Sequence, residues 1–305
     1  MKRFATSAVA TMLTSAAFAE ENADVCRALV LSGGGNNGAW EMGVLYGFVN
    51  YGNPADFTYD VVTGVSAGSI NSTVISSWEK GDEVALAQYG SDLWRNLHTS
   101  DVWQDWKLGK VSGLTIMGGA VDNSPLKVFL RGILEQFDGF KRRVTISATD
   151  VNDGVYTEFN QKNMDFTQLS DAAVASASIP LVFPPFTWSD GRILMDGGTV
   201  YNINVEAAIR QCMDIVDDES KIVVDVFICG APETPPSEAE TGHSWENFFR
   251  GWTLDRYYSS TDSLAFSTAA HPTVNMRYVV KQLEGHMGGF SELNFEGDFT
   301  WAAQE

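Results

Sequence analysis

Apolar residues along the chain gather in short runs that end at glycine, and each run is followed by a stretch with helical spacing. Residues 27–32 form such a run before three consecutive glycines, which predicts a buried strand ending in a tight loop. A helix over residues 39–49 should follow. The order then repeats, with a strand over residues 59–64, a glycine turn and a helix over residues 70–78. This alternation predicts an α/β fold whose parallel sheet is covered by helices on both faces.

The rest of the chain continues this pattern less regularly. The later elements that we expect are helices at residues 126–137 and 169–176 and strands at residues 143–149, 193–195 and 221–229. The last of these is the final core strand that the pattern supports. Proline-rich residues 180–185 and 231–242 predict irregular turns, whereas residues 91–119 give no assignment. Because no repeat or boundary divides the chain, we expect a single domain over residues 20–305.

The N-terminus has the pattern of an export signal. Lys2 and Arg3 precede an alanine-rich apolar stretch, and Ala17-Phe18-Ala19 fits a cleavage site between small residues. We therefore expect residues 1–19 to be a signal peptide and the protein to be secreted or exported, into a secretory lumen, the periplasm or the extracellular space. The alternative is a membrane anchor, for which this stretch is short.

Composition limits the partners. Hydrophobic residues make up 44% of the 305 residues, as in a globular protein, and the formal net charge is −19. Such a charge repels nucleic acid and anionic headgroups. A lipid partner would therefore be contacted transiently, through apolar and aromatic surface more than through general electrostatic attraction.

The three cysteines, Cys26, Cys212 and Cys229, allow one intramolecular disulfide at most. We expect Cys212 to pair with Cys229, which would leave Cys26 structural or free. Their spacing does not suit a zinc site.

The strongest local motif is Gly64-Val65-Ser66-Ala67-Gly68, a G-x-S-x-G between a predicted strand and a predicted helix. Gly64 and Gly68 suit a crowded, strained turn that lifts the Ser66 hydroxyl from the carboxyl edge of the sheet. The helix that follows directs its positive end toward the same point, which favours developing negative charge. The alternative is an ordinary glycine-rich turn.

The second motif is the loop with Gly33, Gly34, Gly35 and Gly38. Glycines let backbone N–H groups approach a reacting carbonyl, as an oxyanion hole requires. The same loop also fits G-x-G-x-x-G, with Asp60 at a suitable distance for a ribose contact, so a dinucleotide site is a rival interpretation. A nicotinamide enzyme usually works where its cofactor is abundant, so export argues against the dinucleotide interpretation.

The third motif is Asp196-Gly197-Gly198, directly after the predicted strand at residues 193–195. Asp196 should lie at the same sheet edge as Ser66, where its carboxylate could take the serine proton. It could also be a simple turn aspartate, with Gly197 and Gly198 supplying the turn. A conventional triad would need a histidine, for which His286 is the best candidate.

These motifs occur together with a fourth block, Ala175-Ser176-Ala177-Ser178-Ile179-Pro180, and over residues 29–204 their order resembles the patatin-like phospholipases. The resemblance implies a three-layer α/β/α sandwich with a mainly parallel sheet, a Ser66–Asp196 dyad and an oxyanion hole on the Gly33–Gly38 loop. It implies no metal or cofactor. One position departs from the family, because Asn37 stands where a basic residue is common.

The resulting hypothesis is a lipid acyl hydrolase, a phospholipase A-type enzyme or related esterase, that works through a Ser66 acyl-enzyme with Asp196 as general base. Two alternatives stay open: a secreted lipid-binding or storage protein with weak or no catalysis, and a dinucleotide-dependent oxidoreductase. An aromatic stripe at Trp245, Phe248, Phe249 and Trp252 predicts either core packing or a lid beside the site.

Overall fold

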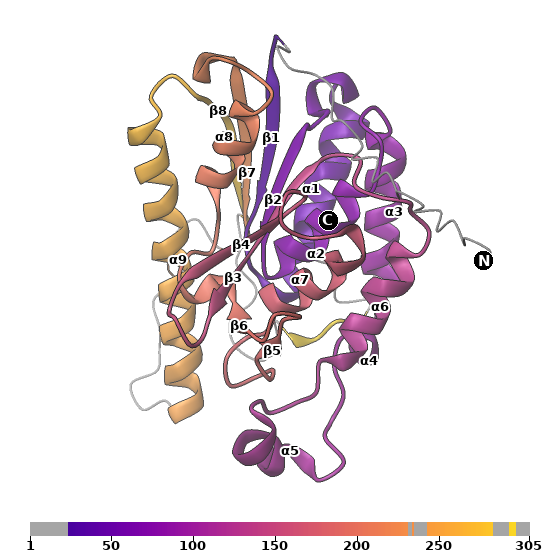
Figure 1. The fold of residues 1–305 in the computed structure, drawn as a ribbon, viewed down its shortest axis with the longest axis vertical. Coiled ribbons are helices and arrows are strands. Elements are labelled where there is room, and N and C mark those ends of the chain that lie inside the picture. The colour runs from indigo at the N-terminus through magenta and orange to yellow at the C-terminus, as the bar shows by residue number, and fades with distance from the viewer. Residues whose placement is uncertain (1–23, 231–233, 235–242, 283–292, 297–305) are drawn as a thin grey trace, which may run out of the picture.

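The computed structural model describes residues 24–230, 234, 243–282 and 293–296, so the predicted signal peptide at residues 1–19 lies outside the described residues. A mixed, mostly parallel eight-stranded sheet forms the centre (Figure 1). Its strands are β1 Cys26–Leu31, β2 Val61–Val65, β3 Arg143–Asp150, β4 Tyr156–Asn160, β5 Phe186–Thr187, β6 Ile193–Asp196, β7 Ile222–Ile228 and β8 Asn275–Lys281.

The strand order is β5-β6-β3-β2-β1-β7-β8, with β4 paired to β3. Strands β3, β2, β1, β7 and β8 run parallel, whereas β4, β5 and β6 are antiparallel to their neighbours. The predicted α/β class is therefore confirmed. Helices flank the sheet on both faces, whereas the short helix α5 projects from the body (Figure 1). The helices are α1 Gly38–Tyr51, α2 Ala67–Ser76, α3 Glu83–Arg95, α4 Thr99–Val102, α5 Gly109–Ser112, α6 Ser124–Leu134, α7 Leu169–Ser176, α8 Val205–Met213 and α9 Ser244–Ala270.

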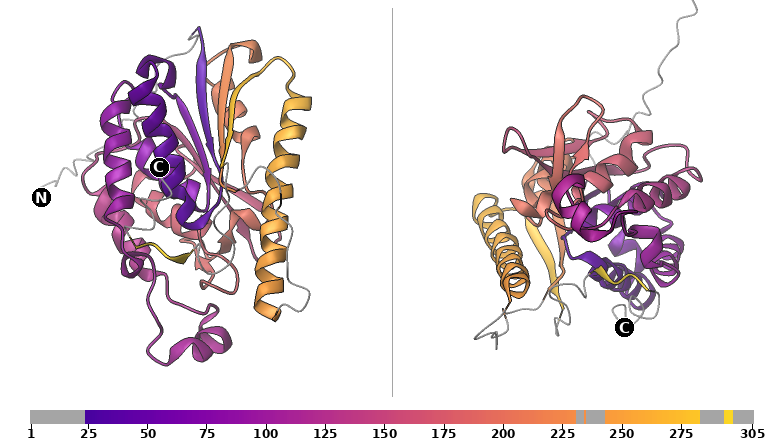
Figure 2. Two further views of the ribbon diagram at one scale, coloured as in Figure 1. Left: turned by 180° about the vertical axis from the view of Figure 1, so that it is seen from behind. Right: turned by 90° about the horizontal axis from the view of Figure 1, so that it is seen from below.

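Strand β1 shows how the two faces arise from alternation. Leu29 and Leu31 point into the cluster covered by α1, α2, α3, α6 and α7, whereas Ala28 and Val30 point into the cluster under α8. Helices α8 and α9 lie on this second side of the molecule (Figures 1 and 2). A strand buried on both faces has few polar positions, which is why residues 27–32 form an unbroken apolar run.

The predicted strand at residues 221–229 is β7, but the sheet continues beyond this last core strand. Strand β8 pairs in parallel with β7 and extends the sheet by one strand. Its residues are largely half-buried or exposed, because β8 is an edge strand, so the apolar run that marks β1 is missing there. In the described ranges, no helix is both long enough and apolar enough to cross a membrane.

Strand β3 is longer than its neighbour β2, and this difference positions the end of β6. Val65 of β2 pairs with Ser147, and the next residue of β3, Ala148, pairs with Asp196 of β6. Because β4 already covers the other edge of β3 at Ala148, β6 occupies the edge that β2 leaves at Val65. Asp196 therefore arrives next to the end of β2.

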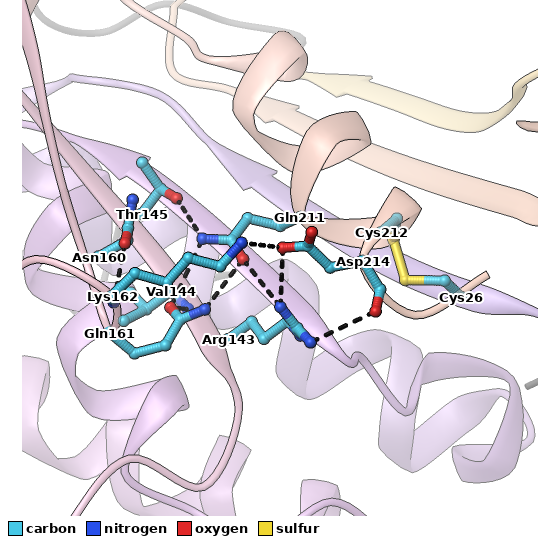
Figure 3. Close-up of polar contacts among 10 residues, drawn as sticks. All are labelled: Cys26, Arg143, Val144, Thr145, Asn160, Gln161, Lys162, Gln211, Cys212 and Asp214. Atoms are coloured by element: carbon cyan, nitrogen blue, oxygen red, sulfur yellow. Dashed lines mark hydrogen bonds and ion pairs between the residues drawn. A yellow bond between two sulfur atoms is a disulfide. The ribbon is translucent and has the colours of Figure 1, made fainter. Parts of the chain in front are cut away.

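The disulfide joins Cys26 to Cys212, with a Cα–Cα distance of 5.6 Å, so the expected Cys212–Cys229 pairing is wrong. Cys26 begins β1, and α8 runs back along the sheet to end beside it (Figure 3). Cys229 directly follows β7, at the carboxyl edge of the sheet, and is a buried free thiol. The two expected partners, Cys212 and Cys229, thus lie at opposite ends of the sheet.

A polar cluster beside the disulfide fastens α8 to the start of β3 (Figure 3). Arg143 donates to Asp214 at 3.0 Å and to Gln211 at 3.5 Å, while Gln161 donates to the same Gln211 oxygen at 2.9 Å. Lys162 pairs with Asp214 as well. The hairpin of β3 and β4 and the end of α8 are therefore held together at the edge of the sheet remote from Ser66.

Replacing Cys26 and Cys212 together by alanine should lower the free energy of unfolding by about 2–5 kcal/mol, because the disulfide closes a loop with a sequence separation of 186 residues. Urea unfolding with and without reductant measures the effect. The wild-type protein should lose stability in reductant and the double variant should not. Equal stability of both proteins under both conditions would contradict the assigned pairing.

Candidate active site

Ser66 occupies the turn between β2 and α2 in a strained backbone conformation, with φ of 51° and ψ of −119°. The flanking glycines are required by space. A Cβ on Gly64 would lie 2.2 Å from the carbonyl oxygen of Gly68, and one on Gly68 would lie 2.6 Å from the backbone of Leu31. Steric crowding thus explains the two glycines of the motif. The strained backbone conformation falls on Ser66, the residue of this turn that carries a hydroxyl.

The Ser66 turn is held by a serine from the fourth sequence block. The Ser66 N–H donates to Ser176 Oγ at 2.8 Å, and that hydroxyl donates to the carbonyl of Ser147 at 2.6 Å. Ser147 is also the β3 partner of Val65, so these hydrogen bonds link β2, β3 and α7 to one another. The nucleophile turn is therefore fixed to the same stretch of β3 that positions β6.

Asp196 ends β6 and is only 4% exposed. Its N–H donates to the carbonyl of Ser178 at 2.9 Å, and its Oδ1 accepts from the Gly198 N–H at 2.7 Å. Oδ2 is buried, and no donor within the described ranges meets it. Burial raises the pKa of Asp196 to about 6, against the opposing effects of Ser66, the Gly198 N–H and the charge of Arg256.

Ser66 and Asp196 therefore come together from distant parts of the chain. The Ser66 side chain is close enough to lower the pKa of the Asp196 carboxyl, although the pair falls short of a well-aligned hydrogen bond. Catalytic contacts in unliganded sites are often loose and tighten with substrate. A carboxylate with one open, desolvated oxygen beside a serine hydroxyl can act as a proton acceptor.

The glycine loop lies directly over Ser66. A Cβ on Gly33 would sit 3.0 Å from the Ser66 Cβ, and Gly35 has a φ of 58° that favours glycine. The Gly33 N–H donates to the carbonyl of Asn202, and the Gly38 N–H donates back into the loop. The N–H groups of Gly34 and Gly35 have no acceptor within the described part of the chain. These two donors are available for an oxyanion.

Asn202 joins the glycine loop to the Asp196 turn. Its Nδ2 donates to the carbonyl of Gly33 at 3.1 Å and to Ser260 Oγ at 3.1 Å. A Cβ on Gly198 would lie 2.8 Å from its Oδ1. Gly197 is equally confined, because its Cβ would lie 2.4 Å from the carbonyl of Ser147. Both glycines of the Asp-Gly-Gly turn thus permit close backbone packing.

Buried polar groups support the loop from below. Asn37 accepts from Gln282 Nε2 at 3.1 Å, so its side chain points toward the end of β8. Glu41 accepts from the Ser32 N–H at 2.8 Å and from Asn71 Nδ2 at 3.0 Å, and burial raises its pKa to about 8. No local motif marks Glu41 or Gln282, since their importance comes from contacts with residues distant in sequence.

Residues 29–209 match the family described as patatin-like phospholipase. The chain belongs to this family. Among solved structures, VipD from Legionella pneumophila is similar over 96% of this chain and 72% of that chain, with 12% sequence identity and a TM-score of 0.42. A comparison with curated proteins finds no match.

The patatin-like region contains the glycine loop, Ser66 and Asp196, but it ends before α9 and β8. The site nevertheless receives Arg256 and Ser260 from α9 and Gln282 from just beyond β8. A sequence search for family motifs does not reach these residues.

The alternatives from sequence are less well supported by the geometry. Asp60 accepts from the Arg27 N–H at 2.9 Å, at the amino end of β1, so it is remote from a ligand on the glycine loop. Of the described histidines, His98 lies near Glu296, His243 is exposed at the start of α9, and His271 lies between Glu206 and Glu219. His286 lies outside the described residues. No cluster of potential metal ligands occurs among the residues that the structure describes.

Proposed function

We propose that this protein is a serine lipid acyl hydrolase in which Ser66 is the nucleophile and Asp196 the general base. One observation carries the proposal: the strained Ser66 turn lies beside a buried carboxylate with an open oxygen, under a loop with two unused N–H donors. Nucleophile, base and oxyanion donors are the three parts that acyl transfer requires. Membership of the patatin-like family supports a lipid ester as substrate.

In the first step, the Ser66 Oγ attacks the acyl carbonyl carbon while its proton passes to Asp196. The carbonyl π electrons move to oxygen, and the Gly34 and Gly35 N–H groups stabilise the oxyanion. The oxyanion then collapses and the bond to the alcohol breaks. Asp196 returns its proton to the departing alkoxide, which leaves an acyl ester on Ser66.

In the second step, water takes the place of the alcohol. Asp196 removes a proton from the water as its oxygen attacks the acyl-enzyme, and the same loop donors receive the new oxyanion. The bond to Ser66 breaks, the serine oxygen regains the proton from Asp196, and the fatty acid is released. The site returns to its starting state without an external redox partner.

Burial of Asp196 explains how a carboxylate could work without histidine. An ordinary aspartate has a pKa near 3.8 and is a weak base, whereas burial raises the pKa of Asp196 to about 6. A base whose pKa approaches the working pH accepts a proton more readily and is still largely ionised at neutral pH.

We also propose that the protein is exported. The Cys26–Cys212 disulfide supports it, because disulfides persist mainly in oxidising compartments. The transient contact with a lipid surface that composition suggests belongs to the same proposal.

Purified protein should hydrolyse long-chain acyl esters and react at Ser66 with a fluorophosphonate. Ser66→Ala should abolish labelling, and Asp196→Asn should lower hydrolysis by about a hundredfold or more, since general bases contribute roughly 100- to 10,000-fold. Asp190→Asn, which alters an exposed aspartate, is the matched control and should keep activity. Turnover and peptide mapping of the label measure these effects.

Full hydrolysis by Asp196→Asn would remove the proposed base. Lipid binding without labelling or turnover in the wild-type protein would instead favour the non-catalytic alternative of a lipid-binding or storage protein.

A further inference from the structure

An apolar tip projects from the body of the protein. It comprises Leu108, Val111, Leu114, Ile116 and Met117, which lie on and around α5. Figure 1 shows α5 extending below the body, and the view from behind in Figure 2 shows the same projection. Leu108, Val111 and Ile116 are 75–77% exposed, a large apolar exposure for one short segment.

The apolar tip is built around fixed contacts. Trp106 donates its indole N–H to the carbonyl of Gly119 at 3.0 Å, and Gly113 packs against its ring. The hydroxyls of Ser112 and Thr115 donate to the backbone of the preceding turn, each at 2.8 Å. These two hydroxyls are thus satisfied within the projection, and the aliphatic side chains of the tip face outward.

The projection is attached next to the candidate site. The N–H groups of Ala120 and Val121 donate to the carbonyls of Leu181 and Val182, in the block that follows Ser178. Ser178 in turn accepts from the Asp196 N–H. A partner bound by the apolar tip would therefore lie at the same edge of the sheet as Ser66.

We propose that the apolar tip inserts into a lipid surface of low charge. Aliphatic side chains gain free energy when they leave water for the acyl boundary of a bilayer, and their contact needs no partner of defined shape. The net charge of −19 disfavours an anionic surface, although Lys107 and Lys110 lie within the projection itself. This proposal rests on the proposed function, in which a lipid surface would supply the ester substrate. Vesicle binding can nevertheless be measured without turnover.

The test is co-sedimentation with phosphatidylcholine vesicles. Leu108→Ser, Val111→Ser and Ile116→Ser combined should weaken binding about tenfold or more, since membrane affinity follows the buried apolar area. Val128→Ser, at an apolar residue 72% exposed on α6, is the matched control and should bind as wild type. Ser66→Ala should also bind, so loss of the proposed function would leave this result intact.

Vesicle hydrolysis should fall in parallel with binding, while hydrolysis of a soluble short-chain ester should change less than about twofold, because the tip does not form the site. Unchanged vesicle binding by the triple variant would overturn the proposal. Stronger binding to vesicles with phosphatidylglycerol than to phosphatidylcholine alone would overturn the low-charge surface. A dimer in light scattering that the triple variant dissociates would identify a second copy as the occupant instead.

A separate observation concerns the peptide between Gly33 and Gly34. Its carbonyl accepts from Asn202 Nδ2 at 3.1 Å and from Arg256 Nη2 at 3.4 Å. The C=O and N–H of a trans peptide point in opposite directions, so donors on the Gly33 carbonyl turn the Gly34 N–H away from themselves. Hydrogen bonds to the carbonyl also polarise the N–H and make it a better donor.

Both donors to the Gly33 carbonyl are positioned by residues on one face of α9. Arg256 is 8% exposed and its guanidinium lies 4.8 Å from the centre of the Trp252 ring. Ser260, one helical turn further, accepts from Asn202. Of the aromatic stripe expected on this helix, Trp252 therefore serves as a support for Arg256, whereas Phe248 is exposed.

We infer that Arg256 is a positioning residue for the oxyanion loop, which it reaches from α9 through the Gly33 carbonyl. This inference rests on the proposed function. Among the described residues, the charge of Arg256 lowers the pKa of Asp196 and of the buried Cys229, and the charge of Glu41 raises the pKa of Cys229. Because Asp196 is the one of these in the proposed reaction, the charge of Arg256 should also influence the pH dependence.

Arg256→Met should lower kcat on a soluble ester about tenfold or more, below the roughly 100- to 1,000-fold loss for deleting an oxyanion donor outright, with little change in KM. Losing the positive charge should also move the acidic limb of the pH profile to higher pH. Arg256→Lys keeps the charge and should leave the limb in place. Arg131→Met, an exposed cation on α6, is the control.

An unchanged kcat and pH limb in folded Arg256→Met would overturn the inference, as would an effect confined to KM for phospholipids, which indicates a headgroup contact. Should Arg256→Met fail to fold, Arg256→Gln keeps a donor without charge and must still move the limb. Wild-type protein without Ser66-dependent turnover would overturn the proposed function and this inference together. If the wild-type protein turns over and replacing Arg256 changes neither kcat nor the pH limb, the inference alone is overturned.

Discussion

The antiparallel pairing of β6 with the overhanging end of β3 is the contact on which the candidate site depends. It places Asp196 opposite Ala148, one residue beyond the point where Ser147 pairs with Val65. At this position Asp196 is only 4% exposed, and its burial raises the pKa of its carboxyl group. The same register therefore sets both the position of Asp196 and its raised pKa, and a shift by one residue would turn the side chain to the opposite face of the sheet.

This arrangement leaves several groups strained or desolvated. Ser66 holds a positive φ, Asp196 leaves one oxygen without a donor in the described ranges, and Glu41 is buried under the loop with a raised pKa. Strain and unsatisfied polar atoms cluster at functional sites because the surrounding structure can hold them there. Around this site the surrounding contacts come from β3, α7 and α9, which gives a physical reason for the dense hydrogen bonding of Ser176 and Asn202.

Sequence motifs predicted what is local and missed what is contributed from a distance. The turns at Gly64 to Gly68 and at Asp196 to Gly198 could be found because steric crowding allows few residue types there. The disulfide was mispredicted because spacing does not reveal that α8 returns to the start of β1. Arg256 and β8 gave no signal, since one buried arginine and one half-exposed edge strand look ordinary in sequence. Their roles arise only when tertiary packing brings them to the loop.

The most direct test of the Ser66–Asp196 pair is the pH dependence of fluorophosphonate labelling at Ser66. The account predicts a rate that is low while Asp196 is protonated, rises as it ionises and is half-maximal near pH 6. Asp196→Asn should react slowly and without this inflection. A wild-type rate that is flat through this range, or an inflection that persists in Asp196→Asn, would contradict the pairing of hydroxyl and carboxylate.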